Sequence, residues 1–216
     1  MTGWAVSPVD APADAPGVRI AGLILAGGAG RRMGGADKAL LRLQDRPLLL
    51  HVADRFAPQV DDLALSANGD LARFSPFGWP VLPDAGDRRD GPLAGLLAGL
   101  TWAATQGASH LATVSVDTPF LPCDLVPRLL LAAGTAQRVA VAESGGRLHP
   151  TCGLWPAHIR PALEAALDQG ERRIGRWAES LGAAAAHFGE RPDPFFNINR
   201  PEDLAEAEAL WRTGQV

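Results

Sequence analysis

The sequence has few cysteines, no excess of positive charge and no long hydrophobic run. Its two cysteines, Cys123 and Cys152, are too few for a disulfide framework or a cysteine-based metal cluster, and we expect both to be reduced thiols of a cytoplasmic protein. A net charge of -4 argues against a general nucleic-acid-binding protein, which needs basic residues to neutralise phosphates. No stretch of 18 apolar residues occurs, so no membrane-spanning helix is expected.

The remaining composition is that of an ordinary globular protein. The chain has 216 residues, of which 47% are hydrophobic and 20% charged, and this length suits one α/β domain. Residues 1–17 contain three prolines and lack the basic and apolar segments of a secretory signal. We therefore predict a disordered extension over 1–17 and a single domain over 18–216.

A glycine-rich stretch follows the first strand-like segment. Residues 20–26 form a short apolar run typical of a strand buried on both faces. Five glycines follow between 27 and 35, together with Arg31, Arg32 and, slightly later, Lys38. Backbone amides of such a loop can surround an anion, and three cations beside them favour a polyanion such as a triphosphate. The alternative is a surface loop with solvated charges.

The two common phosphate-binding loops do not fit this stretch. Lys38 is followed by Ala39, so the Gly-Lys-Ser/Thr end of a P-loop is missing. A dinucleotide-binding fingerprint is excluded because the glycines are separated by one residue too many, with two arginines inside the turn.

Strand-like and helix-like segments alternate along the rest of the chain. This alternation predicts βαβ units and a single Rossmann-like α/β domain, with a mostly parallel central sheet flanked by helices. Ligands of such sheets bind outside the carboxyl ends of the strands, where the residue 27–38 loop, Asn68, Asp84 and Asp117 are expected to meet. The expected strands are 20–26, 62–67, 79–82, 110–116, 138–142 and 148–155, and the expected helices are 47–58, 92–105 and 122–133.

Residues 25–38, LAGGAGRRMGGADK, resemble the signature of the molybdenum cofactor guanylyltransferases, and further similarity recurs as far as residue 204. The resemblance implies a fold of the nucleotide-diphospho-sugar transferase type. It also implies a magnesium-dependent transfer of GMP from GTP to the terminal phosphate of molybdenum-bearing molybdopterin, with release of pyrophosphate. Arg31, Arg32, Lys38 and Asp117 would be the catalytic residues of this reaction.

Asp117 is the expected ligand of Mg²⁺, the one cofactor that we predict. It follows an apolar strand-like run, and magnesium is normally held by one or two carboxylates together with phosphate oxygens. The segment VDTPFLP, residues 116–122, resembles the family segment that carries the magnesium-binding aspartate. The alternative is a helix cap, since aspartate before Thr-Pro is common at turns.

Two polar residues after other strands are ambiguous from the residues alone. Asn68 precedes Gly69 and Asp84 follows Pro83, so each could simply belong to a turn. The resemblance assigns both to nucleotide binding, Asn68 to the guanine nucleotide and Asp84 within PDAGDRRDGPLAG. It further implies that Leu25, Ala26 and Gly27 contact GTP through backbone groups.

The acceptor half of the site has weaker candidates. His149 lies in a segment that is similar to the family's HP-x-x-GLW, although a structural histidine and a buried Cys152 thiol are the more common explanation, ahead of a Cys/His nucleophile. Asn197 and Asn199 resemble the family's FxNxNTPEDL, with Arg200 in place of threonine; they would cap a helix, bind the acceptor, or do both. Residues 171–176 form a basic patch that suits a pterin phosphate or, alternatively, a solvated helix face.

Two other functions remain open at this point. A cytidylyl- or sugar-phosphate nucleotidyltransferase would keep the fold and change the base, although cytidylyl relatives tend to carry alanine where Gly27 stands. A protein that delivers molybdopterin without catalysis would need neither the triphosphate loop nor the metal carboxylate. The expected partners are GTP and molybdopterin as substrates, with molybdoenzymes or cofactor-handling proteins beside them, and neither nucleic acid nor membrane.

Overall fold

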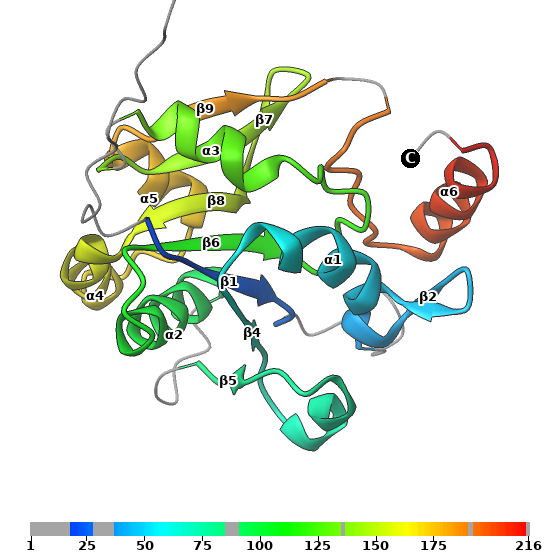
Figure 1. The fold of residues 1–216 in the computed structure, drawn as a ribbon, viewed down its shortest axis with the longest axis horizontal. Coiled ribbons are helices and arrows are strands. Elements are labelled where there is room, and N and C mark those ends of the chain that lie inside the picture. Colours follow the sequence, from blue (N-terminus) through cyan, green and yellow to red (C-terminus); the bar gives the residue numbers. More distant parts are fainter. Residues whose placement is uncertain (1–17, 28–36, 85–90, 135–136, 190–191, 215–216) are drawn as a thin grey trace, which may run out of the picture.

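A computed structural model describes residues 18–27, 37–84, 91–134, 137–189 and 192–214. In these residues a central sheet of seven strands has the order β5-β4-β1-β6-β8-β7-β9 (Figure 1). The extension predicted over 1–17 lies outside the described residues. Among the helices of the described residues, none is both long and apolar enough to cross a membrane.

The sheet is parallel except for one strand. Strand β8 (Arg147–Pro156) runs antiparallel to both of its neighbours, whereas the pairings that connect the other six strands are parallel. The prediction of a mostly parallel α/β sheet is therefore confirmed. The remaining strands are β1 (Ile20–Leu25), β4 (Asp62–Ser66), β5 (Val81–Leu82), β6 (His110–Ser115), β7 (Ala140–Ser144) and β9 (Ala184–His187).

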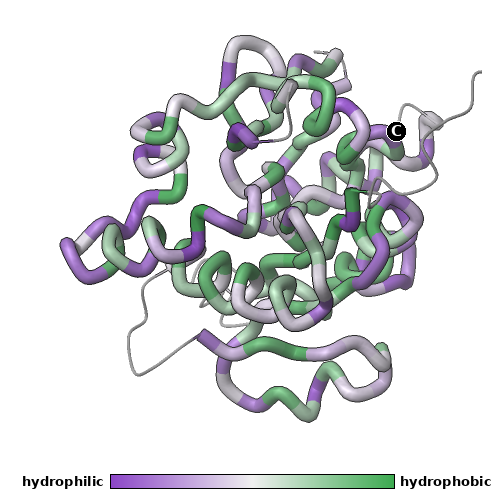
Figure 2. The backbone as a smooth tube through the Cα atoms, turned by 60° about the vertical axis from the view of Figure 1, so that its left-hand side comes forward, coloured by the Kyte–Doolittle hydropathy of each residue, from purple (hydrophilic) through white to green (hydrophobic). Residues whose placement is uncertain are grey.

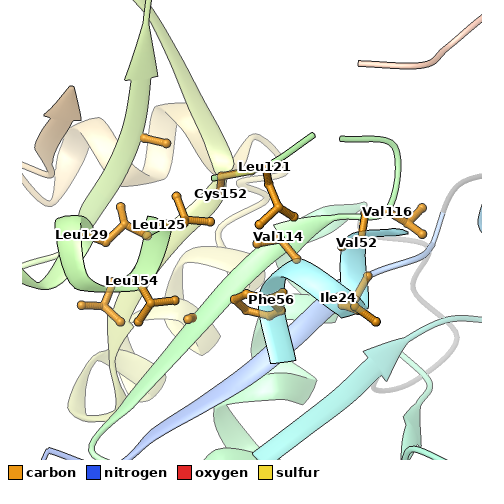
Figure 3. Packing of buried hydrophobic residues seen from close by; sticks show 14 of the residues in the cluster. Ile24, Val52, Phe56, Val114, Val116, Leu121, Leu125, Leu129, Cys152 and Leu154 are labelled. Atoms are coloured by element: carbon orange, nitrogen blue, oxygen red, sulfur yellow. The ribbon is translucent and has the colours of Figure 1, made fainter. Parts of the chain in front are cut away.

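Helices cover both faces of this sheet. On one face α1 (Leu48–Phe56) and α3 (Leu125–Ala133) pack in a core that includes Phe56 and Leu129. Figure 3 shows Val52 and Phe56 of α1 close to β1 and β6. On the other face lie α2 (Pro92–Thr105), α4 (Arg160–Asp168) and α5 (Ile174–Ser180). In Figure 2, hydrophobic segments run through the middle of the molecule.

Helix α2 lies against the sheet because two of its residues have no side chain. A Cβ atom added at Gly99 would lie 2.6 Å from Leu23 Cδ2 and 2.8 Å from Leu111 Cδ2. At Gly95 an added Cβ would lie 2.4 Å from Ser66 Oγ. The small residues of this helix therefore set its approach to β1, β4 and β6.

The last helix, α6 (Pro201–Arg212), forms a separate small core at the carboxyl end of the sheet. It packs on the hairpin of β2 (Arg42–Leu43) and β3 (Arg46–Pro47), which follows the short 3-10 helix η2 (Lys38–Leu40). The buried side chains of this core are Leu43, Leu48, Phe120, Ile198 and Ala207.

Some predicted boundaries are wrong by one to three residues. Pro47 ends β3 and caps α1 instead of opening it, because the chain pairs in a hairpin first. The helix predicted from 122 begins at Leu125, because the preceding residues form turns. The strand predicted over 79–82 is reduced to Val81–Leu82, because only these two residues pair with β4.

Candidate functional site

Four of the parallel strands end side by side, and the predicted nucleotide residues follow them. Gly27 comes after β1, Asn68 after β4, Asp84 after β5 and Asp117 after β6. Leu25 and Ala26 are buried at the end of β1, and the Ala26 amide donates to the Ser66 carbonyl at 2.9 Å. Arg31 and Arg32 lie outside the described residues, so their assignment to the triphosphate stays a prediction.

Lys38, Asp117 and Asn199 meet at this edge although they are far apart in the sequence. The ammonium of Lys38 donates to Asp117 Oδ2 at 3.1 Å and to Asn199 Oδ1 at 2.5 Å. The Ser115 hydroxyl donates to the other carboxylate oxygen of Asp117 at 2.5 Å. The Lys38 and Asp117 side chains keep only 18% and 13% of their surface exposed, so water screens the pair weakly. The structure thus joins the predicted phosphate cation to the predicted metal ligand.

The C-terminal segment crosses the edge beside Asp117. The backbone amide of Ile198 donates to the Asp117 carbonyl at 2.9 Å, and the Asn199 amide group donates to Asn197 Oδ1 at 2.9 Å. The helix α6 is capped by the carboxylate of Asp203, which accepts from the backbone amides of Asn199 and Arg200. The interpretation of the two asparagine side chains as helix caps is therefore wrong, and Asn199 faces Lys38 instead.

Asn68 and Asp84 form a reciprocal pair at the β4–β5 side of the edge. The Asn68 side chain donates to Asp84 Oδ2 at 2.7 Å and accepts from the Asp84 backbone amide at 3.0 Å. A Cβ atom added at Gly27 would lie 4.0 Å from Asn68 Nδ2, so the end of β1 is close by. These residues and the Lys38 group follow neighbouring strands at the same edge of the sheet, as the strand-end rule predicted.

His149 lies further along the same edge, where β8 begins. Its Nε2 is 2.8 Å from the Ser144 hydroxyl, which donates to Asp193 Oδ1 at 2.8 Å. Since that hydroxyl proton is directed to Asp193, His149 Nε2 carries a hydrogen and donates to Ser144. The ring also stacks on Phe195, and burial lowers the pKa of His149 while the nearby Asp193 raises it in part. Ser144 and Phe195 therefore hold the His149 ring in one orientation.

Cys152 is not a nucleophile. The thiol is buried in the core beneath α3, and burial raises its pKa to about 11. The thiolate that would attack a substrate is therefore negligible at neutral pH. The prediction of a buried Cys152 thiol is confirmed, and Cys123 is free and exposed.

The predicted basic patch at 171–176 is partly neutralised by its own acid. Backbone amides of Arg172 and Arg173 donate to the Glu171 carboxylate and lower its pKa, and Arg176 lies 3.6 Å from it. The patch is near the N-terminus of α2, because a Cβ atom added at Gly91, the N-cap of that helix, would lie 3.8 Å from the Arg172 carbonyl. Its role toward a pterin phosphate stays a prediction.

Asp117 is the carboxylate that would hold a magnesium ion at this site. In the described ranges no group of three or more histidine, cysteine, aspartate or glutamate side chains could hold a metal. Mg²⁺ is usually bound by one or two carboxylates and takes its remaining ligands from substrate phosphates and water, and Asp117 suits this coordination. The donor set is compatible with a metal that arrives with a nucleotide.

Several polar partners in this site had not been singled out from the sequence. Ser115 and Ser144 end strands and carry no motif, and Asp193 and Arg73 lie in irregular or 3-10 segments. Asp37 does stand inside the signature, directly before Lys38. This position indicates that Asp37 lies near the site.

Comparison with known proteins gives consistent matches. Residues 22–186 match the family described as the MobA-like NTP transferase domain. A protein named molybdenum cofactor guanylyltransferase from Cereibacter sphaeroides is 56% identical over 195 residues, covering 90% of this chain and 98% of that protein. A protein of the same name from Mesorhizobium japonicum is 50% identical over 201 residues, covering 90% and 97%.

The fold also matches solved structures. The molybdopterin-guanine dinucleotide biosynthesis protein A from Archaeoglobus fulgidus superposes with a TM-score of 0.70 at 22% identity. The match covers 89% of this chain and 99% of that chain, so the two proteins share the whole α/β architecture.

Proposed function

The chain belongs to the MobA-like NTP transferase domain family, and from that premise we propose that it transfers GMP from GTP to molybdopterin. The acceptor is the terminal phosphate of the molybdenum-bearing pterin, and pyrophosphate is released. The observation that carries this reaction is the identity of 50–56% to two guanylyltransferases over 90% of the chain. Neither the cytidylyl alternative nor the delivery protein is favoured by these relatives.

The reaction is an in-line substitution at phosphorus. An oxygen of the acceptor phosphate bonds to the α-phosphorus of GTP, and the bond from that phosphorus to the pyrophosphate oxygen breaks. The acceptor phosphate is ionised near neutral pH, so the protein needs no general base. The tasks left to the chain are to position the two substrates and to neutralise charge.

Lys38 and Asp117 have complementary tasks in this proposal. The Lys38 ammonium, already 3.1 Å from Asp117, would neutralise charge that develops on the leaving pyrophosphate, together with Arg31 and Arg32. Asp117 would hold Mg²⁺, and the ion when bound supplies positive charge to phosphate oxygens. The Ser115 hydroxyl fixes the carboxylate, which limits the motion of its metal-binding oxygens.

The base and the acceptor occupy opposite ends of the edge. Asn68 and Asp84 would contact the guanine nucleotide, with Leu25, Ala26 and Gly27 contributing backbone groups beside them. Asn197 and Asn199, together with His149, would contact the acceptor. The position of Asn199 supports this division. Lys38 donates to both Asn199 and Asp117, and the two substrates must meet beside these residues.

The same proposal places the reaction in the cytoplasm. The two cysteines of the described residues are free thiols, and one is exposed, which suits the reducing cytoplasm. Molybdoenzymes or cofactor-handling proteins would receive the product.

The decisive experiment is calorimetric titration with GTP, CTP and ATP in the presence of magnesium. We expect GTP to bind most tightly and Asp117→Asn to weaken this binding, while Asp54→Asn, an exposed carboxylate that pairs with Arg46, leaves it unchanged. A preference for CTP would overturn the guanylyl assignment. Absence of binding by all three nucleotides would overturn the transferase itself.

A further inference from the structure

Arg73 is held in one position by several groups of the nucleotide edge. It belongs to the 3-10 helix η4 (Leu71–Phe77), and its Nε donates to Asp37 Oδ2 at 2.5 Å. One terminal nitrogen donates to the Asn68 carbonyl at 3.0 Å, and the other to the Asp70 carbonyl. The guanidinium lies 4.3 Å from the centre of the Phe74 ring, and 25% of the side chain is exposed. Arg73 therefore contacts both Asp37, which precedes Lys38, and Asn68, and both belong to the proposed GTP site.

Asp37 is the negative charge that Arg73 neutralises. Its Oδ1 accepts from the Ala39 amide at 3.0 Å and so caps the short helix that carries Lys38. An unpaired carboxylate one residue from a triphosphate-binding lysine would repel the phosphates. Because Arg73 pairs with the second oxygen of Asp37, the cap is kept without that repulsion.

Asn68 is the other residue that Arg73 holds. Its side chain is paired with Asp84, and its backbone carbonyl accepts from Arg73. Arg73 therefore connects the exposed turn at Asn68 and Gly69 with Asp37, the residue before Lys38. In the described part of the chain this guanidinium contacts both Asp37, beside the proposed phosphate-binding Lys38, and Asn68, which would contact the base.

We propose that Arg73 is a positioning residue for GTP: it neutralises Asp37 beside Lys38 and fixes the backbone of Asn68. The inference rests on the proposed function, since it concerns the same nucleotide site. Arg73 itself need not touch the nucleotide. Its effect is therefore expected in nucleotide affinity, and part of that effect should depend on the charge of Asp37.

The test is GTP binding by calorimetry for the full chain with Mg²⁺ and without acceptor. We expect Arg73→Gln to weaken GTP binding about tenfold, as removal of a charge-assisted hydrogen bond does. Asp37→Asn in the same chain removes the unneutralised charge, so the double variant should bind GTP at least threefold more tightly than Arg73→Gln alone. A residue that only stabilises η4 would show no such rescue.

Arg128 provides a matched control. It also lies over a phenylalanine ring, at 4.1 Å from the centre of Phe188, and pairs with an aspartate, Asp124. Arg128→Gln should leave GTP affinity within twofold of the parent chain. Thermal melts verify that each variant is folded; if Arg73→Gln is not, Arg73→Lys takes its place, with an expected loss of about threefold because the charge remains.

The outcomes separate this inference from the proposed function. If the parent chain fails to bind GTP, the proposed function is wrong. If the parent binds GTP but Arg73→Gln binds within twofold of it, or the double variant shows no rescue, the inference about Arg73 is wrong and the function stands.

Discussion

Replacing Lys38 with methionine is the sharpest test of the proposed catalytic group. The change keeps a long apolar side chain and removes the ammonium that donates to Asp117 and Asn199. Lys38 is also the only lysine of the chain, whose other basic residues are arginines. Amine-directed labelling therefore reports on this one side chain, apart from the N-terminal amine.

The magnitude follows from the contacts that are lost. Hydrogen bonds to charged groups contribute about 1.5–3 kcal/mol each. Since 18% of the Lys38 side chain is exposed and the Ser115 hydroxyl stays on Asp117, water and this hydroxyl offset part of the loss. We expect the free energy of unfolding to fall by about 1–3 kcal/mol, which lowers Tm by roughly 2–10 °C in a chain of this size.

The catalytic loss should be larger than the loss of stability. Removing one donor that stabilises a developing negative charge costs about 100-fold or more in kcat. Steady-state formation of the guanine dinucleotide, measured with Lys38→Met and Lys38→Arg, gives the comparison. The arginine variant keeps the charge but changes its geometry, so we expect it to recover only part of the rate. Turnover of Lys38→Met within threefold of the parent would refute the phosphate role, and an unchanged Tm would refute the energetic reasoning.

Three further predictions concern neighbouring groups. Ser115→Ala frees one oxygen of Asp117 and should lower kcat/KM about tenfold, whereas Ser109→Ala, at the opposite end of β6, should not; equal rates would contradict a fixed carboxylate. A thiol reagent at pH 7.5 should modify Cys123 and spare Cys152, whose pKa is raised to about 11, and mass spectrometry after digestion would reveal the contrary. The pKa of His149 is lowered from its ordinary value of 6.5. Below pH 6.5 the histidine is therefore protonated to a greater extent in the unfolded chain than in the folded chain. Stability should therefore decline as the pH falls below about 6.5, and less steeply in His149→Gln; parallel melting curves would exclude this contribution.

Much of the sheet could be predicted because its strands carry their own pattern. The apolar segments of β1 and β6 are buried along nearly their whole length, so composition alone identifies them. Strand β9 is different: it consists of three alanines and a histidine, and alanine favours helices. It is a strand because it pairs with β7, an interaction that no local pattern encodes.

The site was predictable as a set of residues and not as a set of contacts. Lys38 and Asp117 were each identified by chemistry and by resemblance, but they are separated by 79 positions, and their contact depends on the sheet order. The Arg73–Asp37 pair was missed because arginine in a short 3-10 segment has no distinctive spacing. Side chains that position other side chains leave little trace in a single sequence.

The crossing of the C-terminal segment over Asp117 has a consequence for synthesis on the ribosome. Asn199 is made 161 positions after Lys38, its partner, and at about 5–20 residues per second this interval lasts roughly ten to thirty seconds. During that time strands β4 to β9 are made, and Lys38 still lacks its amide neighbour. The contact that joins Lys38, Asp117 and Asn199 can therefore form only after nearly the whole chain has been made.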